Sequence, residues 1–193
     1  GEIMTYPKSV DDRQRVEALH DLSILDTSSD VNLDRVTRMC QLIFDVEIST
    51  ISFVDEDRQW CKSYPGLDVC ETEREVAFCN YTIMSDNIFE VPDAAHNPTF
   101  ANNRLVTESP FIRYYAGAPL IFQGVRLGAL CLIDSRPREA LSVRQREILV
   151  ELAHMVVHEV STNRLIRKSL ASIGAGASLQ RVPMDTGAIR KSG

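Results

Sequence analysis

Residues 112–134, IRYYAGAPLIFQGVRLGALCLID, decide the fold of this chain. Two apolar runs, 113–122 and 125–134, flank the pair Gln123-Gly124. A two-residue connection that ends in glycine is typical of a tight β-hairpin, so we expect two long antiparallel strands here. Pro119 has no amide proton to donate to a neighbouring strand, and we therefore expect a bulge or an edge position at this residue.

A second hairpin is expected upstream, between residues 47–54 and 59–64. Within 47–54 the side chains alternate, which places Ile51 and Phe53 on one face of a strand and Ile48, Thr50 and Val54 on the other. The polar stretch between the two runs predicts a turn. Further along, 66–76 is expected to be a loop and 88–91 a short strand.

Helical spacing of apolar residues predicts helices near both ends of the chain, at residues 11–25, 32–44 and 142–168, with a short one at 75–84. Ser142 and Gln145 form a capping-box pattern that opens the longest helix. One buried stripe is expected on this helix at Leu149, Leu152, Ala153, Val156 and Val160. A second apolar strip, too wide for one sheet contact, indicates a partner helix and consists of Ile148, Met155, Leu165 and Ile166.

The composition excludes several classes of protein. The 193 residues carry a net charge of −6 and a pI near 5.2, which argues against nucleic acid as a partner. No apolar run is long enough to cross a membrane, and no signal peptide is recognisable at the start. Five cysteines without a C-x-x-C pair indicate reduced thiols, and hence a cytoplasmic location.

These elements predict an α+β fold with one main domain. We expect an antiparallel sheet of about five or six strands, with helices from both ends of the chain on one face and loops with a short helix on the other. Residues 1–10 are expected to be a disordered lead, 11–168 the domain, and 169–193 a flexible tail or linker because large apolar residues become scarce there.

Four blocks of sequence, in this order and at this spacing, resemble the GAF domain family. They are FCNYTI at 78–83, VPDAAHNPTFA at 91–101, IRYYAGAPL at 112–120 and GVRLGALCLID at 124–134. The resemblance is to the sensor branch that is attached to histidine kinases, diguanylate cyclases or phosphodiesterases. It implies a GAF fold with a ligand pocket, a non-catalytic sensory role, and a homodimer formed by the N-terminal helix and the 142–168 helix. It also implies an effector domain in a longer chain.

The same resemblance implies a pocket between the sheet and its covering segments, in which aromatic rings supply flat walls and polar groups supply handles for a small planar or amphipathic molecule. Packing within the core is the alternative role for each aromatic residue. The sequence indicates no particular cofactor or ligand, and no metal site is expected. The candidate ligand-binding residues are Trp60, Cys61, Phe78, Cys79, Asp93, Phe100, Arg113, Tyr114, Tyr115 and Cys131.

Alternatives to a small-molecule sensor remain open at this point. A GAF domain whose own aromatics close the pocket would serve only for dimerisation. Free methionine sulfoxide reduction, which some GAF proteins perform with pocket cysteines, would involve Cys61, Cys70 and Cys79. Bilin attachment at Cys79 is disfavoured because Asn80, rather than histidine, follows it, and the cyclic-nucleotide signature of the family is missing. Cys79 lies near an expected helix start, where a thiol pKa can be lowered. Two roles therefore remain open for this thiol, a redox-sensing one and a structural one.

Overall fold

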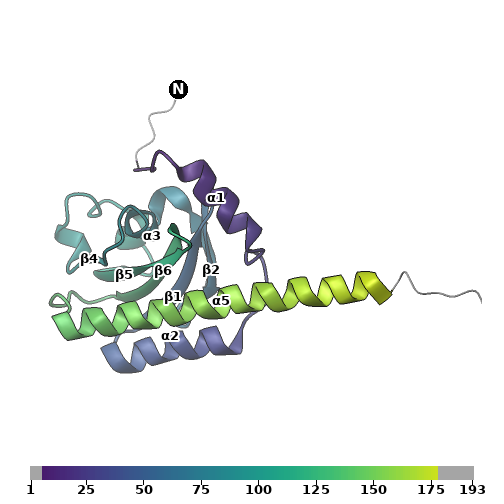
Figure 1. Ribbon diagram of the computed structural model, residues 1–193. Coiled ribbons are helices and arrows are strands. Elements are labelled where there is room, and N and C mark those ends of the chain that lie inside the picture. Colours follow the sequence, from purple (N-terminus) through teal and green to yellow (C-terminus); the bar gives the residue numbers. More distant parts are fainter. Residues whose placement is uncertain (1–5, 178–193) are drawn as a thin grey trace, which may run out of the picture.

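The computed structural model describes residues 6–177 and is built around a six-stranded antiparallel sheet (Figure 1). The strand order is β3-β2-β1-β6-β5-β4, so the two hairpins meet where β1 pairs with β6. The strands are β1 (Ile48–Val54), β2 (Arg58–Ser63), β3 (Glu71–Glu73), β4 (Phe89–Val91), β5 (Tyr114–Phe122) and β6 (Val125–Asp134). This α+β architecture confirms the predicted fold class.

The β5–β6 hairpin forms as the sequence predicts. Gln123 and Gly124 have φ angles of 51° and 79°, the left-handed pair that a tight hairpin turn requires. Pro119 is opposite Ala129 of β6, while β4 pairs only with residues 115–117 on the other side of β5. The proline therefore lies at an open edge of the sheet, where its missing amide proton leaves no partner unsatisfied.

Three longer helices contribute to the apolar core on one face of the sheet, and short helices cover the other face (Figure 1). The longer ones are α1 (Asp12–Asp21), α2 (Val31–Phe44) and α5 (Val143–Ala177). The short ones are α3 (Cys79–Thr82) and α4 (Arg104–Thr107), with 3-10 turns η1 (Arg74–Val76) and η2 (Ala94–His96).

Side-chain alternation along β1 divides the interior into two cores. Ile51 and Phe53 pack with the long helices, whereas Ile48 and Val54 pack under the short ones. The division confirms the two faces expected from residues 47–54. All five residues of the predicted stripe on α5 are buried in the helix-side core.

Side-chain caps fix the starts of the two longest helices. Asp30 Oδ1 accepts hydrogen bonds from the amides of Asn32 (2.9 Å) and Leu33 (3.1 Å) at the start of α2. At α5, the Gln145 amide donates to Ser142 Oγ (3.2 Å) and the Ser142 amide donates to Gln145 Oε1 (2.9 Å). The reciprocal pair confirms the predicted capping box.

The structure differs from the sequence-based expectations in three segments. The expected loop 66–76 contains β3 and η1, and the expected helix 75–84 is reduced to the single turn of α3. The helix α5 continues to Ala177, so 169–177 is helical rather than a flexible tail. Residues 1–5 and 178–193, which complete the predicted lead and tail, lie outside the described residues.

A buried ion-pair network explains why the expected helix 75–84 is interrupted. Arg74 has no exposed surface, and its guanidinium donates two 2.7 Å hydrogen bonds to the two carboxylate oxygens of Asp12 in α1. Its Nε donates to Asn80 Oδ1 (2.7 Å), and Asn80 in turn donates to the carbonyl of Pro7 (2.8 Å). Part of the expected lead is thus tied to the domain. Arg15 Nε donates to Asp12 Oδ1 as well (2.9 Å).

This network predicts a pH dependence of stability at acid pH. Burial raises the pKa of Asp12, but hydrogen bonds from Arg74 and Arg15 outweigh burial and hold it at about 2. Because the folded pKa lies below the unfolded value of 3.8, the stabilisation is complete above pH 3.8 and is lost as the pH falls through 2. Relative to Asp12→Asn, we expect the wild type to lose about 1–2 kcal/mol of unfolding free energy over this window. Urea titrations of both proteins between pH 5 and pH 2 measure this; a constant difference would contradict it.

Candidate functional site

A cavity of about 80 Å³ lies between the sheet and the segments that cover its second face. A single water needs roughly 10–15 Å³ of such space, so the cavity has room for several waters or for a small organic molecule. It is lined by Thr50, Gln59, Cys61, Leu67, Val69, Glu71, Thr72, Phe78, Cys79, Leu105, Ser109, Pro110, Ile112, Tyr115 and Ile133.

Four of the predicted site residues line this cavity: Cys61 on β2, Phe78 and Cys79 at the start of α3, and Tyr115 on β5. Phe100 forms a second layer behind them, with its ring stacked on Phe78 at a centroid distance of 4.2 Å. The structure thus brings together residues from three of the sequence blocks.

Cys131 lies directly behind Cys79, and the two sulfur atoms are 3.2 Å apart. The hydroxyl of Tyr115 lies 3.5 Å from the first sulfur and 3.4 Å from the second. Thr82 Oγ1 is 2.7 Å from the same hydroxyl. The floor of the cavity is therefore a network of thiols and hydroxyls.

The other predicted site residues do not line this cavity. Trp60 and Tyr114 are strand neighbours of Cys61 and Tyr115, so their side chains point to the opposite face and pack in the helix-side core. Asp93 accepts a hydrogen bond from the Ala95 amide (3.2 Å) and thereby caps η2. The guanidinium of Arg113 donates to the carbonyls of residues 106 and 112. The hydrogen bonds of Asp93 and Arg113 therefore stabilise the loops in which they lie.

Sequence reasoning missed much of the cavity wall. The strand alternation that separates Thr50 from Ile51 was a usable signal for Thr50, which lines the cavity from the centre of β1. No periodic pattern marks Leu67, Val69 or Leu105, because these residues come from irregular segments and a single helical turn. Their place in the wall depends on the path of the loops.

Charged groups are scarce at this site. Of the lining residues, Glu71 is the one that carries a charge, and its carboxylate accepts a 2.7 Å hydrogen bond from Arg58. Within residues 6–177, no three histidine, cysteine or acidic side chains gather in a way that could hold a metal ion.

The sequence profile of the GAF domain matches residues 29–160, which include β1 to β6 and every residue of the cavity wall. This chain belongs to the GAF domain family. The match confirms the resemblance carried by the four sequence blocks. The cavity lies between the antiparallel sheet of this GAF domain and the segments that cover it.

A curated relative carries a sequence similar to this GAF domain. A cyclic di-GMP phosphodiesterase from Pseudomonas aeruginosa is 36% identical over 161 residues, which is 83% of this chain and 27% of the relative. The chain thus spans about a quarter of the length of the curated relative it matches.

Solved structures with the same fold share little sequence with this GAF domain. The GAF domain of a phosphoenolpyruvate-protein phosphotransferase from Coxiella burnetii is 15% identical with a TM-score of 0.61, covering 81% of this chain and 94% of that one. The blue-light absorbing form of the PixJ GAF domain from Thermosynechococcus elongatus is 9% identical with a TM-score of 0.59, covering 88% and 98%. Free methionine-R-sulfoxide reductase from Neisseria meningitidis, in complex with its substrate, is 17% identical with a TM-score of 0.58, covering 86% and 99%.

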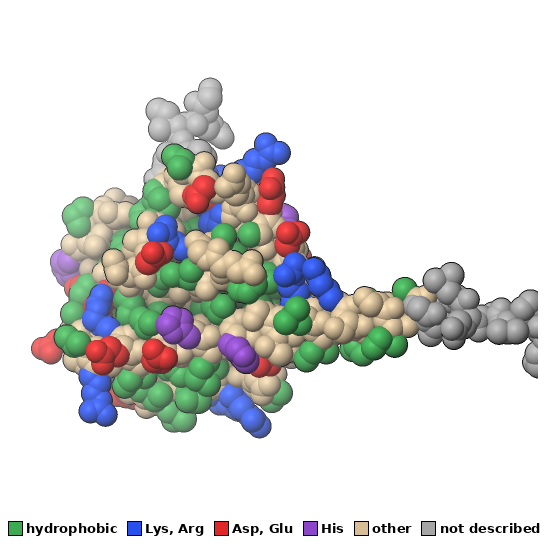
Figure 2. Space-filling model, viewed as in Figure 1, with side chains coloured by type: hydrophobic (Ala, Val, Ile, Leu, Met, Phe, Trp, Pro, Cys, Tyr) green, Lys and Arg blue, Asp and Glu red, His purple; other side chains and the backbone are tan. Residues whose placement is uncertain are grey.

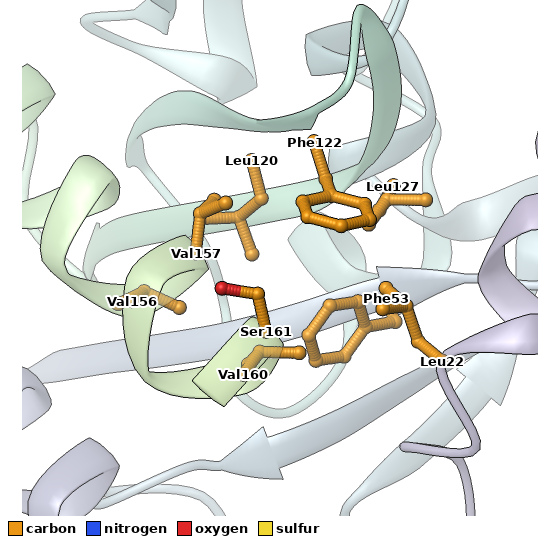
Figure 3. A pocket seen from close by; sticks show the side chains of 9 residues that line it. All are labelled: Leu22, Phe53, Leu120, Phe122, Leu127, Val156, Val157, Val160 and Ser161. Carbon is orange, nitrogen blue, oxygen red and sulfur yellow. The ribbon is translucent and has the colours of Figure 1, made fainter. Parts of the chain in front are cut away.

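A much smaller gap lies on the helix face of the sheet, between α5 and the strands (Figure 3). Its volume is about 10 Å³, which is no larger than one water needs. Apart from Ser161, its lining is apolar, and side chains such as Phe53 and Val160 point into it. The gap is a packing defect, and the candidate ligand site is the cavity on the other face.

The helices α2 and α5 expose apolar side chains on the outside of the GAF domain (Figure 2). On α2, Leu42 is 82% exposed, and on α5, Met155 is 53% exposed. We call this surface the α2–α5 face; it consists of Val31, Met39, Leu42 and Ile43 on α2 and Met155, Leu165, Ile166, Leu170 and Ile173 on α5. The apolar residues of α1, such as Leu19, are instead buried.

Among the described residues, no helix is both long and apolar enough to span a membrane. The helix α5 is long, but its exposed apolar residues alternate with charged ones such as Arg164 and Arg167.

Proposed function

We propose that this GAF domain is a non-catalytic sensor, which binds a small uncharged molecule in its cavity and signals through its helices to an effector. The cavity carries the proposal, because it combines apolar walls with a few hydrogen-bonding groups, as small-molecule sites commonly do. A GAF domain used only for dimerisation has no need of such a space.

The charges of the wall define the class of ligand. No lysine, arginine or histidine is among the lining residues, so a phosphate or carboxylate group would enter without a counter-charge. Thr50, Gln59 and Thr72 offer hydroxyl and amide groups, while Phe78 and Tyr115 offer ring surfaces. A small, flat molecule with one or two polar atoms satisfies both features.

The thiols at the cavity support binding rather than turnover. Burial raises the pKa of Cys61 to about 12 and holds that of Cys79 well above its usual value. Rapid enzymatic turnover by a cysteine needs a lowered pKa or an adjacent base. The acidic side chain at the cavity, Glu71, is engaged by Arg58 instead.

Phenol, a neutral ring with one hydroxyl, tests whether the cavity accepts this class of ligand. In a titration of the full 193-residue chain followed by amide NMR, we expect shifts concentrated at residues such as Thr50, Cys61 and Tyr115. Val69→Trp, at a lining residue that is 58% exposed, should weaken binding at least tenfold by covering the cavity. The matched variant Val10→Trp, outside the cavity at an exposed position before α1, should bind as the wild type does. Shifts scattered over the surface, or equal binding by both variants, would count against the proposal.

The α2–α5 face is the proposed route for output. An exposed apolar surface of this kind is typical of a protein–protein contact. Ile166, Leu170 and Ile173 follow one another at spacings of four and three residues, the pattern of a coiled-coil seam, on the part of α5 that projects beyond the sheet (Figure 1). We propose that two copies pair through this face. In this dimer α2, rather than the N-terminal helix expected from the sequence, pairs together with α5. By analogy with the curated relative, the effector would be an enzyme of cyclic di-GMP metabolism.

Leu42→Asp is expected to weaken this dimer at least tenfold while leaving the fold intact, since the side chain is exposed in the single chain. Sedimentation equilibrium over a range of protein concentrations gives the dissociation constant. The matched variant Val10→Asp, at an even more exposed position before α1, should dimerise as the wild type does. A wild type that stays monomeric at high concentration would refute the interface.

A further inference from the structure

Two buried cysteines from distant segments meet at the floor of the cavity. Cys79 is the first residue of α3 and lines the cavity, and Cys131 lies in the middle of β6, opposite Thr50 and Gly117. Their sulfur atoms are 3.2 Å apart, and both side chains are almost completely buried. A disulfide bond of about 2.05 Å requires the sulfurs to approach by roughly a further 1 Å.

The surroundings of the pair are built from hydroxyl groups. The Tyr115 hydroxyl is within 3.5 Å of both sulfurs, and Thr82 holds this hydroxyl from the other side. Gly117 makes the arrangement possible, because a Cβ at this position would lie 2.3 Å from the Tyr115 oxygen and 2.5 Å from Thr82 Oγ1. The Tyr115 side chain therefore packs against the backbone of Gly117, and its hydroxyl reaches the two thiols.

The neighbouring groups shift the pKa values of the two thiols in opposite directions. Burial raises the pKa of Cys131, but hydrogen bonds from Cys79, Thr50, Tyr115 and Ser52 outweigh burial and lower it. Burial and the neighbouring Cys131 raise the pKa of Cys79. Cys79 is therefore the weaker acid of the two thiols, which lie 3.2 Å apart.

We propose that Cys79 and Cys131 form a redox modification site, which closes to an intramolecular disulfide when hydrogen peroxide enters through the cavity. In the first step the Cys79 sulfur attacks one peroxide oxygen and the O–O bond breaks. The other oxygen takes up the thiol proton and leaves as water, so that Cys79 becomes a sulfenic acid.

In the second step, Cys131 attacks the sulfur of the Cys79 sulfenic acid, and the S–O bond breaks. The departing oxygen takes up the Cys131 proton and leaves as a second water. Overall, two thiols and one peroxide give one disulfide and two waters; both sulfurs are oxidised and the peroxide is reduced. A dithiol reductant reverses the reaction by exchange. The bond would join the covering helix α3 to the central sheet.

The sequence allows a direct test, because trypsin places each cysteine on its own peptide. The folded wild-type chain is treated with hydrogen peroxide, blocked with iodoacetamide, digested without reduction and analysed by mass spectrometry. We expect the cross-linked pair of peptides 75–104 and 127–138, at least tenfold above any other cysteine pair. Dithiothreitol before blocking should abolish it.

The competing pair is Cys61 and Cys70, since the Cys61 amide donates to the Cys70 carbonyl (2.7 Å) on adjacent segments beside the same cavity. Peptides 59–62 and 63–74 cross-linked in place of the expected pair would overturn the proposal. The proposal would also be overturned if Cys79 and Cys131 are still alkylated after a peroxide treatment that has oxidised the partly exposed Cys70. Cys131→Ser should lose the cross-link and Cys40→Ser should keep it. The wild-type peptide map decides the question even if a variant fails to fold.

Discussion

Gly128→Ala is expected to lower the free energy of unfolding by about 3 kcal/mol or more. Gly128 lies in β6 opposite Phe53 of β1, at the junction of the two hairpins. A Cβ at this position would lie 1.9 Å from the Ser52 carbonyl oxygen and 2.8 Å from the Phe53 Cα. Both neighbours are backbone atoms of a central strand, so neither can move without breaking the pairing of β1 with β6.

Urea unfolding monitored by circular dichroism measures this loss. Gly174→Ala is the matched control, because a Cβ there meets nothing within 4 Å and alanine favours the helix. We expect the control to unfold at the same or a slightly higher urea concentration. Equal stability of the two variants would show that the close approach of β1 to β6 is not as the structure has it.

Arg74→Met is expected to cost about 3–5 kcal/mol, because it leaves the Asp12 carboxylate buried without its main partner. The substitution also removes the hydrogen bonds from the guanidinium to Asn80 and to the carbonyls of residues 55 and 56. These contacts join α1, the β1–β2 turn and α3. The loss of unfolding free energy should therefore exceed the loss caused by removing any surface ion pair in the described part of the chain.

Arg104→Met provides the comparison for this variant. Arg104 pairs with Glu73 where the side chains are 49% and 65% exposed, and such pairs contribute between about 0 and 1 kcal/mol. Chemical denaturation of both variants at neutral pH gives the two values. A cost for Arg74→Met as small as that for Arg104→Met would contradict the role assigned to the buried network.

The regular parts of the fold were predictable because their patterns are local. The Gln123-Gly124 turn and the capping box at Ser142 each depend on residues within a few positions of one another, and both form as expected. The interruption of the 75–84 helix was not predictable in this way. It depends on Arg74 reaching Asp12, which is 62 positions away in the sequence.

The site was predictable only in part, and strand alternation explains which part. The motif blocks contain segments that border the cavity, yet Trp60 and Cys61, or Tyr114 and Tyr115, are adjacent and point to opposite faces. One member of each pair lines the cavity. The contact between Cys79 and Cys131 could not be inferred, because it depends on how α3 lies over β6.

We expect a ligand in the cavity to alter the helices on the opposite face of the sheet. Hydrogen–deuterium exchange of the full chain, with and without saturating phenol, tests it most directly. We predict slower exchange in the cavity wall, around Thr50 and Tyr115, together with a change in α2 and in the 143–177 helix. Slower exchange confined to the cavity wall, with both helices unaltered, would contradict the claim.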